Sequence, residues 1–168
     1  MMIVDAQIHL WAKGKPSAHH RQTPYLKDEA LAAMDEAGVD RAVIHPVMWD
    51  PDSNELAVEA ARAHPDRFAI MGWIYLDDPQ QRALLETWKS RPGMKGLRFY
   101  FSDPRSQSWP EDGTLELLFP VAERLNIPVS LVNDQLQKKL SEQRDRLKLP
   151  NGVGDMKVEN GELVMTQK

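Results

Sequence analysis

IVDAQIHLW, residues 3–11, has the alternating pattern of a β-strand with two different faces. Successive side chains of a strand point to opposite sides, so its apolar residues share one face: Val4, Ala6, Ile8 and Leu10. The other face carries Asp5, Gln7 and His9. A strand in a buried parallel sheet is normally apolar throughout. This polar row is therefore either a hydrogen-bonded ladder or part of a functional site.

Composition limits the classes of protein to which the chain can belong. It has 168 residues, of which 42% are hydrophobic and 27% charged, as in a globular protein with one core. The net charge of −4 and the pI of about 5.7 argue against nucleic acid as a partner. There is no cysteine for a disulfide or a thiolate metal site, and no apolar run long enough to span a membrane. We expect a cytoplasmic protein with no membrane partner.

Strand-like and helix-like segments alternate along residues 1–132. After residues 3–11, strands are predicted at residues 41–45, 68–74, 96–101 and 128–132. Helices are predicted at residues 28–37, from Ser53 to just before Pro65, from Pro79 to just before Pro92, and from Thr114 to Leu125. Ser53 and Thr114 are expected to be N-caps. Such alternation is typical of βαβ units in a parallel sheet.

The number of units predicts about half of a TIM barrel. Each unit takes about 30 residues, whereas a complete (β/α)₈ barrel needs about 250. We therefore expect an α/β fold, with a partial TIM-barrel-like sheet of about five parallel strands and a tail of one helix and a β-hairpin. An open doubly wound sheet is the alternative. Neither GxGxxG nor GxxxxGK[ST] occurs in the chain, so the common nucleotide-binding sites are not predicted.

Residues 133–168 differ in character from the half-barrel domain predicted at residues 1–132. Residues 134–149 predict a highly charged helix with a narrow apolar stripe. Asn160-Gly161, between two strand-like runs, predicts a hairpin in which Val158 faces Leu163 and Met156 faces Met165. A lone hairpin is only marginally stable in water, so this one must pack on the core, on the charged helix or on another chain.

Four segments give the chain a family resemblance: DAQIHLW at residues 5–11, MDEAGVDRAVIHP at 34–46, ARAHPDRFAIMGWI at 61–74 and RPGMKGLRFYF at 91–101. Together they make residues 1–132 similar to the amidohydrolase-related family of TIM-barrel hydrolases. That family includes lactonases, decarboxylases and hydratases of small carboxylated compounds. The resemblance implies a barrel fold and a small carboxylate or lactone as the substrate.

The resemblance also implies a divalent metal such as zinc, which metal-binding members hold with an HxH pair on the first strand. Here the pair is Gln7 and His9, and an amide is a poorer ligand than an imidazole. The family's later ligands are two histidines and an aspartate, whereas no histidine follows His64. His9 is a candidate ligand with Gln7 or Asp5, but a catalytic zinc site usually needs three protein ligands. We therefore expect no tightly bound metal or other cofactor.

A carboxylate-binding site is predicted on the fourth strand. Arg98 and Tyr100 share the face opposite its three apolar residues, near the strand ends where TIM-barrel active sites lie. A guanidinium suits bidentate binding of a carboxylate, and arginines near this point hold substrate carboxylates in the family resembled. His45 and Trp49 are candidates for the same mouth. A structural ion pair for Arg98 and a hydrogen-bonded core role for His45 are the alternatives.

Two histidines, His19 and His20, lie in the polar stretch of residues 13–24. Neighbouring imidazoles on a loop can clamp a metal, but solvated side chains are the simpler interpretation. We do not place them in the predicted site.

Two functions follow from these observations. In the first, the chain is a hydrolase in which His9 is the acid/base group or a ligand, Gln7 orients substrate or water, and Arg98 holds an anion. In the second, it is a truncated and catalytically inactive half-barrel that serves as a binding or assembly module. In either case we expect self-association, because a half-barrel has an open strand edge on each side.

Overall fold

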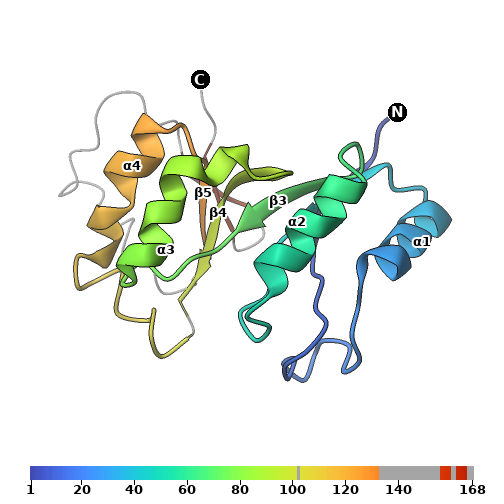
Figure 1. Ribbon diagram of the computed structural model, residues 1–168, viewed down its shortest axis with the longest axis horizontal. Helices are drawn as coiled ribbons and strands as arrows, with labels where there is room; N and C mark the ends of the chain where they lie inside the picture. Colours follow the sequence, from blue (N-terminus) through green and yellow to red (C-terminus); the bar gives the residue numbers. More distant parts are fainter. Residues whose placement is uncertain (102, 133–155, 160–161, 166–168) are drawn as a thin grey trace.

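The computed structural model describes residues 1–101, 103–132, 156–159 and 162–165. Five parallel strands form one sheet in consecutive order: β1 (Val4–Ile8), β2 (Arg41–Ile44), β3 (Phe68–Gly72), β4 (Met94–Tyr100) and β5 (Val129–Val132). Figure 1 shows the helices on one side of this sheet. Consecutive parallel order with helices on one side is the arrangement of a TIM barrel. The predicted α/β fold, a partial barrel of about five strands, is confirmed.

The helices follow the strands as the alternation predicts. They are α1 (Lys27–Ala37), α2 (Ser53–Ala63), α3 (Pro79–Ala83) continued by the 3₁₀ helix η1 (Leu84–Ser90), then η2 (Thr114–Leu117) and α4 (Phe119–Arg124). Helix α1 ends at Gly38, whose φ of 71° is left-handed backbone that glycine adopts without strain. None of the helices in the described part of the chain has the length and apolarity needed to cross a membrane.

Both predicted N-caps are wrong. Ser53 is the first residue of α2, and its buried hydroxyl donates back to the Val47 carbonyl at 2.6 Å, so it fixes the preceding loop instead of capping the helix. Thr114 begins η2, and the single helix predicted from it is broken into η2 and α4. Pro120 explains the break because proline has no backbone N–H to donate to the previous turn.

The core lies between the sheet and the helices. Ile44, Ile70 and Leu97 are fully buried on the helix-facing side of β2, β3 and β4. The pairing of β3 with β4 shifts between Ile70 and Met71, so that the bulge leaves Met94 and Leu97 both buried. From Leu97 onward β4 alternates again. Arg98 and Tyr100 therefore lie on the opposite face, which is the concave side of a barrel.

The hairpin predicted in the tail is present. Strands β6 (Met156–Glu159) and β7 (Glu162–Met165) pair antiparallel, with Met156 opposite Met165 and Val158 opposite Leu163, as predicted. Strand β7 lies near β5, so the hairpin packs beside the last strand of the half-barrel. The predicted charged helix at residues 134–149 and the Asn160-Gly161 turn fall outside the described residues.

Candidate functional site

His9 follows β1 and is held in one tautomer by the backbone of the next strand. Its Nδ1 lies 2.7 Å from the carbonyl oxygen of His45, which can only accept, so Nδ1 carries the proton. Nε2 then has the lone pair, and the Gln7 amide nitrogen lies 3.3 Å away. Burial lowers the pKa of His9, and the positive charge of Arg98 lowers it further, against the raising effect of the bond to His45. The result is a neutral imidazole with its basic nitrogen beside an amide.

His45 is oriented in the reciprocal way. Its Nε2 donates to the carbonyl oxygen of Ala6 at 3.0 Å, and the side chain is 8% exposed. Burial first, and the charge of Arg98 second, lower the pKa of His45 to about 4. Each imidazole therefore bonds the backbone of the neighbouring strand, and this cross-bonding fixes β1 against β2. Among the described residues, Nδ1 of His45 has no hydrogen-bond partner.

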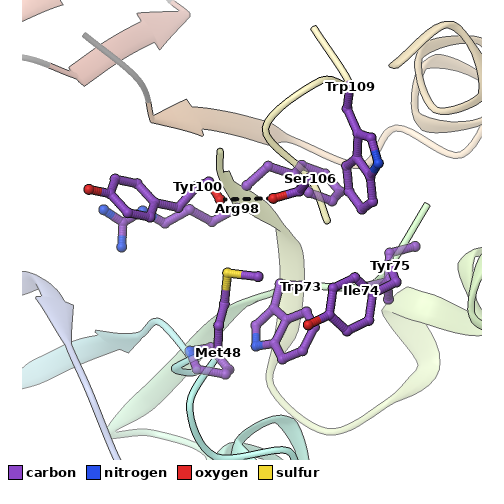
Figure 2. Close-up of a pocket in the computed structure, with 10 residues that line it drawn as sticks. Met48, Trp73, Ile74, Tyr75, Arg98, Tyr100, Ser106 and Trp109 are labelled. Atoms are coloured by element: carbon purple, nitrogen blue, oxygen red, sulfur yellow. Dashed lines mark hydrogen bonds between the residues drawn. The ribbon is translucent and has the colours of Figure 1, made fainter. Parts of the chain in front are cut away.

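Arg98 and Tyr100 of β4, the two residues for which the sequence predicts carboxylate binding, line a small pocket. The cavity is about 50 Å³ and its remaining walls are mostly aromatic or apolar: Pro46, Met48, Trp73, Ile74, Tyr75, Phe99, Ser106 and Trp109. In Figure 2, Met48 and Trp73 lie on one side of this pocket, and Arg98 and Ser106 on the other. A guanidinium against an aromatic wall favours a flat anion. A cavity of this volume holds only a few water molecules.

The far wall of this pocket is built by a loop that the sequence did not single out. Tyr75 donates its hydroxyl to Asp103 at 3.2 Å, and the Arg105 guanidinium lies 3.9 Å from the centre of the Tyr75 ring. Arg105 also pairs with Asp77 at 2.7 Å. Burial, followed by the charge of Asp103, raises the pKa of Tyr75. These contacts place Ser106 and Trp109 against the pocket.

Trp49, predicted to line the same mouth, lies against a different set of residues. Its ring centre is 5.9 Å from that of Trp11 and 5.0 Å from that of His20. His20 is half-buried, and its ring centre lies 5.6 Å from that of His9. The sequence did not place His20 near the site, because nothing in a polar loop indicates which strand end the loop will cover.

Asp50 is the main residue that sequence reasoning missed. It is fully buried, at 0% exposed, and its Oδ2 accepts from the backbone nitrogens of Ala12 at 2.8 Å and Lys13 at 3.1 Å. Its Oδ1 accepts from the backbone nitrogen of Asp52 at 3.0 Å. One carboxylate therefore joins the β1–α1 loop (residues 11–25) to the β2–α2 loop (residues 46–52). The only sequence signal was an aspartate shortly after a strand.

The described residues do not complete the metal site that a family resemblance implies. No three His, Cys, Asp or Glu side chains among them lie close enough together to hold an ion. His9 offers Nε2, Gln7 offers an amide, and the Asp5 carboxylate accepts from the backbone nitrogen of Gln7 at 2.9 Å. One imidazole with an amide is not the donor set of a transition-metal site.

Comparisons with known proteins agree with the fold. A profile of the family described as "Amidohydrolase" matches residues 4–147. A search of curated protein sequences gave no significant match. Among solved structures, a probable 2-pyrone-4,6-dicarboxylic acid hydrolase from Acinetobacter baumannii, with citric acid bound, superposes with a TM-score of 0.62 at 17% identity. The match covers 86% of this chain and 55% of that one.

Two further structures show the same relation. An amidohydrolase from Burkholderia multivorans with bound zinc gives a TM-score of 0.65 at 15% identity, covering 87% of this chain and 54% of that one. A 5-carboxyvanillate decarboxylase from Novosphingobium aromaticivorans gives 0.56 at 16%, covering 85% and 54%; it has bound manganese and 3-methoxy-4-hydroxy-5-nitrobenzoic acid. At these identities the likeness establishes the fold. The chain spans about half the length of the structures that it matches.

Proposed function

The chain belongs to the amidohydrolase family, and we propose that it acts on a small carboxylate-bearing substrate such as a lactone, with Arg98 as the anion-binding residue and His9 as the acid/base group. The observation that carries this proposal is the placement of Arg98. It lines the aromatic-walled pocket, and its charge also lowers the pKa of the half-buried His9 and of the buried His45.

The pocket and the hydrogen bonds around it suggest which chemical role each residue has. A substrate carboxylate bound to Arg98 would bring an adjacent ring toward the aromatic wall formed by Trp73 and Tyr75. Nε2 of His9 takes a proton from a water molecule as that water attacks the ring carbonyl carbon. The ring C–O bond then breaks, and the proton on Nε2 passes to the alcohol oxygen that leaves. Gln7, beside Nε2, orients the water.

Two kinds of structural neighbour support this substrate class. One is named as a hydrolase of a pyrone dicarboxylic acid and has citric acid bound, and another is named as a decarboxylase of a carboxylated aromatic compound. Both compounds carry carboxylates on a flat ring, which suits a guanidinium beside aromatic side chains. Analysis of the reaction product distinguishes hydrolysis from decarboxylation.

The test is a screen of the purified protein against a panel of lactones and aromatic carboxylates. We expect hydrolysis of at least one carboxylated lactone, lost in His9→Gln. His19→Gln is the matched control, because His19 is an exposed imidazole on the loop near His9, and it should keep the activity. Activity that survives in His9→Gln would rule out the assignment of His9.

A second function, a binding or assembly module, is favoured by the exposed edge of the sheet. Within the described residues β1 pairs only with β2, and Ile3 and Val4 at this edge are 45% and 48% exposed. Open edges invite pairing with another chain. Sedimentation at micromolar concentration should then show self-association that weakens in Val4→Lys. A single monomeric species with no affinity for carboxylates would contradict both functions.

A further inference from the structure

We propose that Asp50 is a positioning residue, which docks the β1–α1 loop on the β2–α2 loop and so holds the His20 ring against the His9 ring. The proposal rests on the proposed function, because the position of His20 affects chemistry only if His9 is the acid/base group. The contacts that carry it, however, involve no substrate.

The first observation is the bonding of Asp50. A fully buried carboxylate is costly unless its charge is satisfied, and here three backbone N–H groups satisfy it. Two of the three belong to the β1–α1 loop and one to the β2–α2 loop. The docked loop is therefore the only arrangement in which this carboxylate keeps all three bonds.

The second observation is the close fit at the same contact. Gly14 has a φ of 87°, and a Cβ added there would lie 2.1 Å from the Trp49 carbonyl oxygen. The two loop backbones thus touch at a point where only glycine fits. At the loop base, Trp11 and Tyr25 exchange two backbone hydrogen bonds of 3.0 Å. The β1–α1 loop is closed at its base by Trp11 and Tyr25, and residues 12–14 anchor it on the β2–α2 loop.

The third observation is what the docked loop presents to the site. His20 lies between Trp49 and His9, with its ring centre 5.0 Å from that of Trp49 and 5.6 Å from that of His9. The Ser17 hydroxyl lies 2.8 Å from its Nδ1, which fixes the ring plane. Asp50 touches neither imidazole. Its effect on His9 passes through the loop, and this makes it a positioning residue.

Three variants separate this role from a general loss of stability. Asp50→Asn leaves one acceptor oxygen, so at least one of the three N–H groups loses its partner. Gly14→Ala pushes the loops apart while Asp50 stays intact. Asp52→Asn is the matched control, because it removes the exposed ion pair between Lys13 and Asp52, which joins the same two loops at the surface.

The readout is the imidazole region of carbon–proton correlation spectra, recorded at one pH on the whole chain. His9 and His20 are assigned from His9→Gln and His20→Gln. Because His20 lies against Trp49, its signals should carry a ring-current shift. We expect that shift to be lost in Asp50→Asn and in Gly14→Ala, the His9 signals to move in both, and Asp52→Asn to match the wild type. A separate thermal melt shows which variants remain folded.

His20 signals that stay in place in a folded Gly14→Ala or Asp50→Asn would overturn the proposal. So would an equal change in Asp52→Asn. Succinate binding, measured by calorimetry on the same samples, tests the proposed carboxylate site separately from the positioning role of Asp50. Loss of the His20 shift without any succinate binding to the wild type would support the positioning role and reject the proposed carboxylate site.

Discussion

The mouth of the half-barrel is held by two different kinds of contact. At the ends of β1 and β2, the buried Asp50 carboxylate joins two loops through three backbone N–H groups. At the ends of β3 and β4, Arg105 stacks on Tyr75 and pairs with Asp77, with both charged side chains about 40% exposed. Exposed ion pairs add little stability and can rearrange at little cost. A buried carboxylate cannot rearrange without leaving its N–H partners unbonded, which is costly. The first region is a fixed frame for His9, and the second is an adaptable wall beside Arg98.

Replacing Asp50 in the first region and Arg105 in the second tests this difference most directly. Asp50→Ala leaves three backbone N–H groups without an acceptor, so we expect a loss of about 3–5 kcal/mol in the free energy of unfolding. Arg105→Ala should cost less than about 1 kcal/mol. Urea denaturation of both variants measures the two losses. Similar losses in the two would show that the regions do not differ in the way described.

The fixed region should also make stability depend on pH through His45. Its pKa is lowered from 6.5 to about 4 in the folded state, so above pH 6.5 the imidazole is neutral in both states and has no effect. Between pH 6.5 and 4 the unfolded chain takes up a proton that the folded chain does not. We expect stability to fall across that window by up to about 3 kcal/mol from this group.

Denaturant unfolding at pH 7 and at pH 4 measures this contribution of His45 to stability. His45→Gln removes the titrating group and should flatten the pH dependence. His19→Gln, at an exposed position in the same part of the chain, should keep the wild-type slope. A loss in His45→Gln as steep as that in the wild type would contradict the burial of a neutral His45.

Ligand binding tests the pocket beside the adaptable wall, where Arg98 is the proposed anion-binding residue. Arg98→Lys keeps the charge of the guanidinium but loses its planar fork, so binding of succinate should weaken by about 1–3 kcal/mol. Calorimetry measures the affinity. Arg91→Lys is a suitable control, because Arg91 pairs with Glu55 away from the pocket and should bind as the wild type does. Unchanged affinity in Arg98→Lys would remove Arg98 from the site.

The same difference between regions explains what the sequence could predict. Strand order and the inward face of Arg98 and Tyr100 follow from alternation with a period of two, which is a local property. The hairpin register follows from the Asn-Gly pair in the sequence, which predicts a two-residue turn. The bonds of Asp50 and the contact of His20 with His9 join residues about 38 and 11 positions apart through loops. No local pattern encodes them, so the sequence predicts neither the bonds of Asp50 nor the contact of His20 with His9.

Trp49 and the helix ends illustrate the same limit at shorter range. Trp49 packs against Trp11 and His20 of the docked β1–α1 loop, whereas Trp73 at the next strand end lines the pocket. Ser53 has the composition of an N-cap, yet its hydroxyl bonds the Val47 carbonyl. In both cases a tertiary contact outweighed a correct local preference.

The smallest expected effect is that of a chelator on the region around His9. Nε2 of His9 faces the Gln7 amide, and no three His, Cys, Asp or Glu side chains among the described residues lie close enough together to hold an ion. We therefore expect protein purified without chelator to hold well under one equivalent of zinc or manganese in elemental analysis, and chelator to leave the melting temperature unchanged. His9→Ala is the informative variant. One equivalent of either metal in the wild type, lost in His9→Ala, would show that His9 is a ligand with donors outside the described residues, and its role as the acid/base group would then have to be abandoned.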